Sequence, residues 1–311
     1  MEDRYNHLNK YLKEKFGERV LKICIDGGFT CPNRDGTKGY GGCIFCSERG
    51  SGEHLKNVDI QSQIKNHLNS YRGDRANKFI AYFQNFSNTY DTLENLRQKY
   101  DLAFCDDRII GLEIATRPDC INEEIARLLA EYAKKCYVVV ELGLQTANDE
   151  IGKILNRGYT SADFKRAIQA LEKYGIEVVA HIMVGLPNET DKDIEKTVEF
   201  INAQKVNGIK IHSTYIVKGT ELENLYNAGK YTPLTLEEYI EKACYIISHL
   251  RKDIVIHRVS GDAPKDILIA PEWNAHKKWI MNGIDKKLKE EDLWQGKANR
   301  NSYVKDSKFY M

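Results

Sequence analysis

Hydrophobic residues along the chain alternate between short continuous runs and longer runs with helical spacing. The short runs are typical of buried strands and cover residues 20–26, 79–83, 109–114, 137–142, 177–183 and 208–215. The longer amphipathic runs predict helices at 60–70, 122–135, 161–174 and 190–202, of which the last three open with Asn, Ser or Thr as helix N-caps. Strands that alternate with helices every roughly 30–40 residues predict βαβ units and a parallel sheet.

The six βα units over residues 20–250 predict an α/β fold, a partial (β/α)6 barrel of the TIM type that lacks two of the eight strands. Residues 1–19 form a separate N-terminal segment in this interpretation. A small α/β extension and tail follow at 251–311, with a strand at 254–258 and a helix from 275 to 290. In such barrels the active site lies at the carboxyl ends of the strands, where the βα loops meet.

The composition is that of a globular protein, with 311 residues of which 42% are hydrophobic and 29% charged. The 46 Lys and Arg nearly balance the 45 Asp and Glu, which argues against general coating of nucleic acid and leaves room for a local basic patch. No apolar run reaches the roughly 18 residues that cross a bilayer, and the charged N-terminus does not resemble a signal peptide. We therefore expect a cytoplasmic protein with reduced thiols and no membrane partner.

Three of the eight cysteines, Cys31, Cys43 and Cys46, stand in a glycine-rich loop after the first predicted strand. Glycines between them let the backbone wrap closely around a bulky inorganic group, such as a 4Fe–4S cluster with one open iron. The alternative is a nucleic-acid-binding module stabilised by zinc on these cysteines and Cys24. The six residues between Cys24 and Cys31 match a zinc knuckle poorly, and the apolar strand around Cys24 favours core packing.

The loop and several other motifs resemble a known family. Cys31-x11-Cys43-x2-Cys46, with Phe45 before the last cysteine, resembles the cluster loop of radical S-adenosylmethionine (SAM) enzymes. The string GFTCPNRDGT at 28–37 resembles the YhcC/YtqA (MnmL-like) branch, a relative of the Elongator catalytic subunit and of oxygen-independent coproporphyrinogen oxidases. Further matching motifs are YFQ at 82–84, NTY at 88–90, TRPD at 116–119, ELGLQ at 141–145, NRG at 156–158, HIMVGLP at 181–187 and KGT at 218–220.

The resemblance implies reductive cleavage of SAM at a 4Fe–4S cluster, driven by a one-electron donor such as flavodoxin or ferredoxin, and hydrogen abstraction by the resulting 5′-deoxyadenosyl radical. It also implies tRNA as the substrate, with a carboxymethylaminomethyl side chain on the wobble uridine converted to aminomethyl. The alternative within enzymes is radical chemistry on a small metabolite or a porphyrin-like ring, which the balanced net charge favours. RNA contacts are expected from the basic, aromatic tail at 297–311 and from lysines of the last helix: Lys277, Lys278, Lys286, Lys287 and Lys289.

Polar residues at the predicted strand ends are candidate contacts for the amine and carboxylate of SAM. The stretch after the second strand departs from the superfamily's glycine-rich motif and offers polar acceptors or a simple polar turn: Gln84, Asn85, Ser87 and Asn88. A carboxylate suits the fork of an Arg side chain. Arg157 matches the carboxylate-binding Arg of the coproporphyrinogen-oxidase relatives, and Arg117, next to Thr116, is a second candidate. Either Arg could instead form a surface ion pair.

Other candidates concern the ribose and adenine of SAM. Gln145 ends the fourth strand and could contact the ribose or the carboxylate, while His181 matches a ribose-contacting position in relatives or is a satisfied core histidine. The resemblance also implies Phe45, Gly185, and the end of the sixth strand at Ile216 and Val217 as contacts of SAM, the last three near adenine. Catalytic residues are not identified. Glu113 and Glu141 are expected to bind substrate or to pair with Arg117, Arg157 or Lys218.

Overall fold

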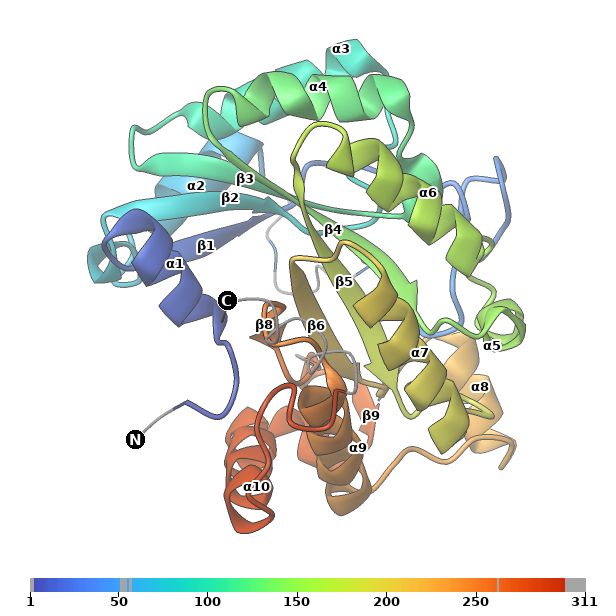
Figure 1. Ribbon diagram of the computed structural model, residues 1–311. Coiled ribbons are helices and arrows are strands. Elements are labelled where there is room, and N and C mark those ends of the chain that lie inside the picture. Colours follow the sequence, from blue (N-terminus) through green and yellow to red (C-terminus); the bar gives the residue numbers. More distant parts are fainter. Residues whose placement is uncertain (1–2, 51–54, 56–57, 262, 300–311) are drawn as a thin grey trace.

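The computed structural model describes residues 3–50, 55, 58–261 and 263–299. The basic, aromatic tail therefore lies mostly outside the described residues. Within them, seven parallel strands form one curled sheet in the order β1-β2-β3-β4-β5-β6-β8 (Figure 1). The strands are β1 (Val20–Ile25), β2 (Lys78–Phe83), β3 (Ile109–Thr116), β4 (Tyr137–Gln145), β5 (Glu177–Val184), β6 (Gly208–Ser213) and β8 (Val255–Arg258). The predicted partial barrel is confirmed.

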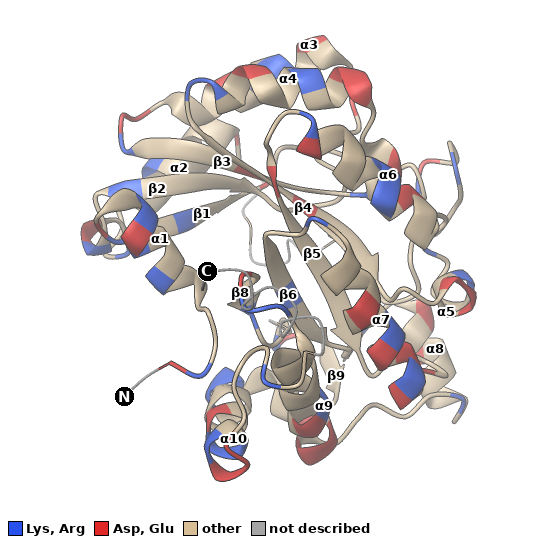
Figure 2. Cartoon of the chain, viewed as in Figure 1, with Lys and Arg blue, Asp and Glu red and all other residues tan. Residues whose placement is uncertain are grey.

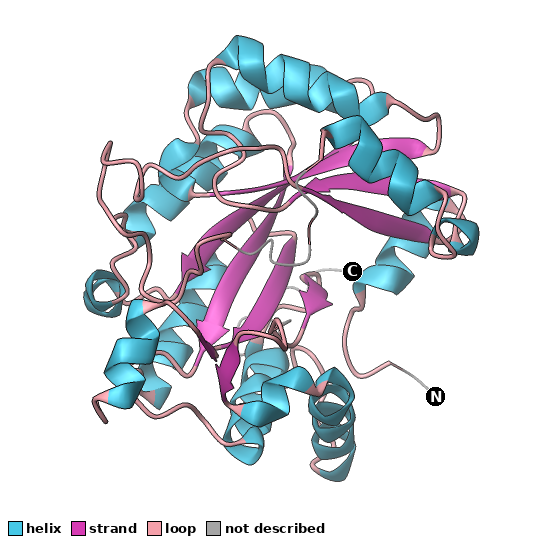
Figure 3. Ribbon diagram, turned by 180° about the vertical axis from the view of Figure 1, so that it is seen from behind, coloured by secondary structure: helices cyan, strands magenta, loops and turns pink. Residues whose placement is uncertain are grey.

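Helices lie along the outer side of the curled sheet, which Figure 3 shows from behind. Their bounds are α1 (Leu8–Phe16), α2 (Ile60–Leu68), α3 (Leu93–Asp101), α4 (Glu123–Ala133), α5 (Asp149–Ile154), α6 (Ser161–Glu172), α7 (Asp191–Ala203), α8 (Glu221–Asn227), α9 (Leu236–His249) and α10 (Lys277–Glu290). Both signs of charge are interspersed over the outer helices (Figure 2). Among the described residues, no helix is long and apolar enough to cross a membrane.

The edges of the sheet, β1 and β8, are connected at one end by the N-terminal segment. Helix α1 packs against both edge strands. Just before it, His7 forms a parallel bridge to Ile256 of β8, and the Ile256 N–H donates to the carbonyl of Asn6 at 2.8 Å. The gap left by the missing strands is therefore partly closed by the N-terminus, and the rest of the open barrel stays available for a ligand.

Strand alternation decides which side chains face the helices and which face the barrel interior. On β1, Ile23 and Ile25 are buried in the main core with Ile64 of α2. Lys22 and Cys24 alternate with them and border an interior cavity. The expectation that Cys24 packs into the core is therefore wrong, because its position in the alternation turns the thiol away from the helices.

Two parts of the C-terminal region differ from the expected layout. The strand at 254–258 was placed in a separate extension, but as β8 it pairs in parallel with β6 and completes the main sheet. The sixth strand ends at Ser213 rather than at residue 215, and Ile216 and Val217 form their own short strand, β7 (Ile216–Val217). Strand β7 pairs antiparallel with β9 (Leu268–Ala270), so this region forms a small second sheet beside the barrel.

Candidate active site

The cysteine loop follows β1 and turns sharply just before its last two cysteines. Gly41 and Gly42 have φ angles of +78° and +77°, which glycine adopts at little cost. The Gly42 N–H donates to the carbonyl of Asn33 at 2.8 Å, and the Cys46 N–H donates to the carbonyl of Cys43 at 3.0 Å. The glycines thus allow the chain to return on itself and to present the C-x-x-C pair on a tight turn.

The loop is fastened to the segment that follows α5. The Asn156 side chain donates to the carbonyl of Gly42 at 2.8 Å, while the Asn33 side chain donates to the carbonyl of Asn156 at 2.5 Å. The Ile44 N–H donates to the carbonyl of Leu155 at 3.0 Å. This set of bonds holds the cysteines over the carboxyl end of β4, the end at which barrel enzymes carry their active sites.

The three loop thiols influence one another electrostatically without surrounding a single ion. Burial, together with the neighbouring thiols of Cys46 and Cys31, raises the pKa of the Cys43 thiol to about 12. Among the described residues, only Glu113, Glu141 and His257 have ligand atoms all within 4.8 Å of one another. Sulfurs on one tetrahedral zinc would lie about 3.8 Å apart. The wider spacing fits three thiolates that each bind a different iron of one cluster.

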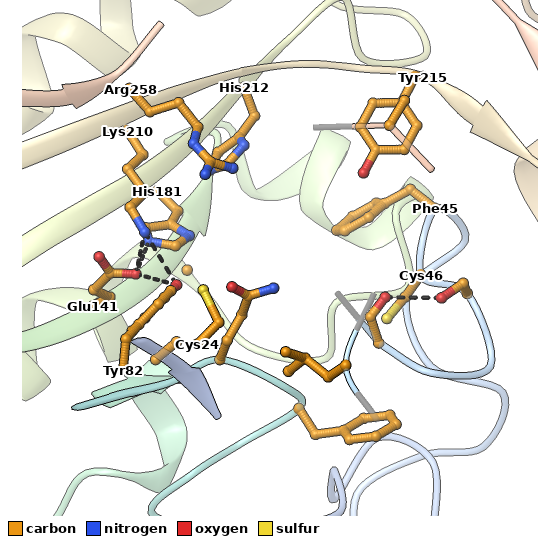
Figure 4. Close-up of a pocket in the computed structure, with 18 of the residues that line it drawn as sticks. Cys24, Phe45, Cys46, Tyr82, Glu141, His181, Lys210, His212, Tyr215 and Arg258 are labelled. Atoms are coloured by element: carbon orange, nitrogen blue, oxygen red, sulfur yellow. Dashed lines mark hydrogen bonds and ion pairs between the residues drawn. The ribbon is translucent and has the colours of Figure 1, made fainter. Parts of the chain in front are cut away.

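A cavity of about 1210 Å³ inside the barrel borders this loop at Phe45 and Cys46 (Figure 4). Its volume exceeds the roughly 300–1,000 Å³ typical of a site for one small ligand, so it has room for a cofactor and part of a substrate. The predicted SAM contacts that line it are Phe45, Gln84, Thr116, Arg117, Gln145, His181 and Val217. The predicted contacts outside the lining are Asn85, Ser87, Asn88, Arg157, Gly185 and Ile216.

Arg117 lies between the cysteine loop and the cavity. Its Nε and Nη2 atoms donate to the two carboxylate oxygens of Asp119 at 2.9 and 3.0 Å, and Nη1 lies 4.0 Å from Cys31 Sγ. Asp119 is also paired with Lys38 at 2.7 Å. A second cation on the same carboxylate leaves the Arg117 region positively charged, which suits an anionic group next to the cluster loop.

Gln145 occupies a bulge at the end of β4 with a φ of +60°. The Tyr159 hydroxyl donates to Gln145 Oε1 at 2.7 Å and fixes the amide within the cavity wall. The amide nitrogen of Gln145 and the second lone pair of Oε1 are the groups that its side chain can offer to a ligand. Its role as a SAM contact stays a prediction.

Arg157 is fully buried, and its donors are used within the protein. Nη1 donates to the carbonyls of Leu144 and Thr146, Nε donates to the carbonyl of Tyr159 at 2.9 Å, and Nη2 pairs with Asp149. The guanidinium thus ties the end of β4 to α5. In this arrangement it does not border the cavity, so a contact with the SAM carboxylate stays a prediction that the local bonds do not support.

Three polar residues after β2 are buried with oxygen atoms that have no hydrogen-bond partner among the described residues: Asn85 Oδ1, Ser87 Oγ and Asn88 Oδ1. The amide nitrogens of Asn85 and Asn88 donate to Asp26 and to the carbonyl of Ala115. Buried acceptors are seldom left unpaired in proteins. The stretch therefore has unused acceptor capacity, but these three residues do not line the cavity, and their contact with the amine of SAM stays a prediction.

The barrel interior contains a charged network that centres on Glu141 of β4 (Figure 4). Glu141 Oε2 accepts from Lys210 Nζ at 2.6 Å and from the Tyr82 hydroxyl at 2.6 Å, and it lies 2.8 Å from His181 Nε2. Burial alone would raise the pKa of Glu141, but Lys210, followed by His181, holds it well below its usual value. His181 thus faces the cavity while its ring is held by Glu141, and its proposed ribose contact stays a prediction.

Glu113 forms the second half of the network with Lys22. The Lys22 ammonium lies 2.5 Å from Glu113 Oε1, 3.6 Å from Glu141 Oε1 and 3.3 Å from His257 Nδ1. The ammonium therefore takes the place that a metal ion would need between these three ligands. Glu113 and Glu141 pair with Lys22 and Lys210, because all four side chains occupy strand positions that face the barrel interior. They do not pair with the expected partners Arg117, Arg157 or Lys218.

Sequence reasoning missed the interior cations and one histidine. Lys210 and His212 alternate with the buried Ile209 and Ile211 on β6, and Arg258 ends β8. All three line the cavity. Burial lowers the pKa of His212 well below its usual value, with His181, Arg258 and Lys210 adding to the effect. The sequence did contain a signal for these residues, because a polar residue at every second position of an otherwise apolar strand indicates a second, polar face.

Comparisons with known proteins agree with this geometry. Residues 31–201 match the family model of the radical SAM superfamily, and residues 206–290 match that of the radical SAM C-terminal domain. The chain therefore belongs to the radical SAM superfamily. It is 38% identical over 301 residues to the protein YtqA of Bacillus subtilis (strain 168), with 95% of this chain and 93% of YtqA covered. The predicted relationship to YtqA is confirmed, and the alternative of a nucleic-acid-binding module stabilised by zinc is rejected.

More distant relatives share part of the chain or only the fold. A tRNA uridine(34) acetyltransferase of Methanocaldococcus jannaschii is 35% identical over 167 residues, which are 52% of this chain and 30% of the acetyltransferase. The structure of Methanocaldococcus infernus Elp3 with an N-terminal deletion superimposes with a TM-score of 0.66 at 19% identity. It covers 89% of this chain, which spans 64% of the Elp3 chain, and it shows a shared fold.

The family implies a 4Fe–4S cluster and SAM, and the residues present fit both groups. Cys31, Cys43 and Cys46, on a loop fixed by Asn156, are the residues that would hold the cluster, and this assignment stays a prediction. The cationic surroundings of Arg117 on the cavity wall are suited to the carboxylate of SAM, and Gln84 places an amide after β2 on the same cavity, where an amine needs an acceptor. The chain is accordingly a radical SAM enzyme.

Proposed function

We propose that this radical SAM enzyme acts on the wobble uridine of tRNA, position 34, and converts a carboxymethylaminomethyl side chain to aminomethyl. The observation that carries the proposal is the charge of the cavity. Among the described lining residues, two are Asp or Glu and seven are Lys or Arg: Lys22, Arg72, Arg117, Lys210, Arg258, Lys265 and Lys277. Glu113 and Asp119, which pair with Lys22 and Arg117 from behind the lining, reduce the excess of positive charge to three (7 − 2 − 2). A chain with a net charge of only +1 thus concentrates positive charge where a substrate would bind, which suits a polyanion.

Cations and exposed aromatic rings lie together at both edges of the open barrel. Arg72 follows α2 on the β1 side and is next to Tyr71, which is 70% exposed. Lys277 begins α10 on the β8 side, close to Trp279, which is 54% exposed. Single-stranded RNA loops are bound by cations that contact phosphates and by aromatic rings that stack on unpaired bases. Of the predicted lysines on α10, Lys277 is the one that lines the cavity.

The inner end of the cavity suits the carboxylate of the proposed side chain. Arg258 supplies positive charge there beside the Lys210–Glu141 pair, and His212 Nε2 is buried without a hydrogen-bond partner among the described residues (Figure 4). A carboxylate would accept from these groups and lower the cost of their burial. The relative named for uridine 34 of tRNA supports the same substrate class, although only 30% of its length is shared.

Bound SAM and a reduced cluster would supply a carbon radical that abstracts hydrogen from the side-chain carbon next to the carboxylate. Loss of one electron from the substrate radical, with the oxidised cluster as the acceptor, would give an imine, which water would hydrolyse to the aminomethyl group and glyoxylate. The protein's part is to hold the substrate carbon near the cluster loop and to exclude other hydrogen donors during the radical step. The reducing electron would come from a flavodoxin or ferredoxin, and the cytoplasm is the proposed location.

Nucleoside analysis after turnover tests the proposed conversion. An anticodon stem-loop that carries carboxymethylaminomethyluridine is incubated anaerobically with reconstituted enzyme, SAM and dithionite, and is then digested for mass spectrometry. We expect the carboxymethylaminomethyl nucleoside to disappear, aminomethyluridine to appear and 5′-deoxyadenosine to accumulate. Persistence of the starting nucleoside, with the cluster intact and SAM cleaved, contradicts the proposal.

Salt dependence of binding separates RNA from a small metabolite or porphyrin-like substrate. Each phosphate contact adds about 1 to the slope of log K against log salt. The Lys265→Gln/Lys277→Gln double variant should weaken stem-loop binding and reduce the slope by about 2. The matched Arg127→Gln/Lys192→Gln variant, on the exposed faces of α4 and α7, should not change the slope. Binding without salt dependence would favour a small substrate.

A further inference from the structure

One buried amide on the cavity wall has a donor without a partner. Asn274 lies in the short 3-10 turn Glu272–Ala275, lines the cavity and is 2% exposed. Its Nδ2 atom has no hydrogen-bond partner among the described residues. A buried donor of this kind is costly, and in native proteins its presence usually has a functional reason.

The Asn274 amide is held through its oxygen. Ser213 Oγ accepts from the Gly261 N–H at 3.2 Å. The Ser213 hydroxyl in turn donates a short hydrogen bond to Asn274 Oδ1. The amide oxygen is therefore held by the protein, and Nδ2 is the end of the amide that has no partner among the described residues.

The turn that carries Asn274 is rigidly attached to the core. The indole N–H of Trp273 donates to the carbonyl of Leu234 at 3.0 Å, and its ring stacks on Tyr239 with centroids 5.4 Å apart. The Asn274 N–H donates to the carbonyl of Pro271 at 3.1 Å. The donor is thus pre-organised, which reduces the entropy lost when a ligand accepts its hydrogen bond.

The surroundings of Asn274 have the parts needed to bind a nucleotide. Tyr215 lines the same cavity, and its ring points toward Phe45 (Figure 4). Lys265 and Lys277 line the cavity as well. An aromatic face can stack on a base, the two ammonium groups can contact phosphates, and the amide nitrogen can donate to an acceptor on the base edge.

We propose that Asn274 recognises the target base, with its Nδ2 group donating to the O4 carbonyl of a uracil ring. Cytosine has an amino group at the corresponding position, so two donors would face each other and cytosine would be rejected. The identification of the base as uracil rests on the proposed function. The need for an acceptor rests on the geometry of Ser213, Gly261 and Asn274 alone.

Replacing the amide donor of Asn274 with an acceptor tests this inference in a binding experiment that needs no turnover. Saturation-transfer NMR on the holoenzyme with SAM compares uridine with cytidine as weakly binding probes. The wild type should give a several-fold stronger signal for uridine. Asn274→Ala should bring the ratio close to one, and Asn274→Asp, which is nearly isosteric, should shift the preference to cytidine. Asn95→Asp, on the exposed face of α3, is the matched control and should keep the uridine preference.

Turnover gives the second readout. Asn274→Ala should lower kcat/KM for the modified stem-loop on the order of 10–100-fold. A rise in KM for SAM large enough to account for this loss would assign the donor to the adenine of SAM and overturn the inference. An unchanged uridine preference in both Asn274 variants would overturn it as well.

The two proposals can fail separately. Uridine preference that Asn274→Asp reverses, together with persistence of the carboxymethylaminomethyl nucleoside, would support base recognition by Asn274 and refute the proposed conversion at the wobble uridine. Conversion of the carboxymethylaminomethyl nucleoside, together with an unchanged base preference in the Asn274 variants, would support the proposed conversion and refute the role of Asn274.

Discussion

Replacing Lys210 with Met removes one charge from the buried network and tests whether charge pairing stabilises the barrel interior. Lys210 is 5% exposed and Glu141 is 1% exposed, with 2.6 Å between Nζ and Oε2. The variant leaves the carboxylate with Tyr82 and His181 as hydrogen-bond partners. Lys22, at 3.6 Å from the other carboxylate oxygen, is a weaker substitute for the missing cation.

Removing one partner of a buried ion pair costs about 3–5 kcal/mol, because the remaining charge is left in a poorly solvated site. At about 2 °C per kcal/mol for a chain of this size, Lys210→Met should lower Tm by roughly 6–10 °C. The Lys210→Met/Glu141→Gln double variant should recover most of this loss, because it leaves neither charge unpaired.

Thermal unfolding of the anaerobic holoenzyme at a fixed scan rate measures these shifts. The exposed Lys192→Met on α7 is the control and should stay within about 1 °C of the wild type. Without Lys210 the pKa of Glu141 rises, so the loss of stability should be smaller at pH 5.5 than at pH 8. A decrease in Tm below 2 °C, or a double variant no more stable than Lys210→Met, refutes the idea of a charge-paired interior.

Two further predictions concern the loop and the end of β5. Asn156→Ala loses the hydrogen bond to the carbonyl of Gly42 and places an alanine at a φ of +51°, which is strained for any residue with a Cβ atom. Because the cysteine loop is then held less firmly, the visible absorbance of the cluster should decay several-fold faster in air. An unchanged decay rate would contradict this role of Asn156. Burial raises the pKa of Glu189 from 4.5 to about 7, although N–H groups of Gly185 and Leu186 oppose the change. Wild-type stability should therefore fall by up to about 3 kcal/mol as the pH rises from 4.5 through 7, and Glu189→Gln should remove this part of the Tm–pH profile. Equal profiles for both proteins would refute the assignment.

The six main strands could be predicted from the sequence because each is a short apolar run between amphipathic helices. Every predicted strand overlaps an observed one, and β1 at Val20–Ile25 ends one residue before the expected bound. The small sheet of β7 and β9 was missed because two- and three-residue strands are shorter than any periodic signal. Strand β8 was found, but its pairing with β6 across α9 could not be read from a local pattern.

The candidate site was predictable where one local segment holds its residues. The cysteine spacing lies within a single loop, so the sequence alone indicated a cluster. The interior network could be seen only from the alternation of several strands together: Lys22, Glu113, Glu141 and Lys210 come from four strands and meet only in the curled sheet. The resemblance to relatives made Arg157 a candidate for the SAM carboxylate, but the sequence could not show that its donors are used by neighbouring carbonyls.

The central claim is that Cys31, Cys43 and Cys46 hold a cluster at which SAM is cleaved, while Cys24 in the barrel interior is not a ligand. The most direct measurement is iron content together with 5′-deoxyadenosine formation by reconstituted protein with SAM and dithionite. Wild type and Cys24→Ala should both bind about four irons and form 5′-deoxyadenosine. Cys43→Ala should lose the cluster and the product. Product formation by Cys43→Ala, or loss of iron in Cys24→Ala, would contradict the assignment.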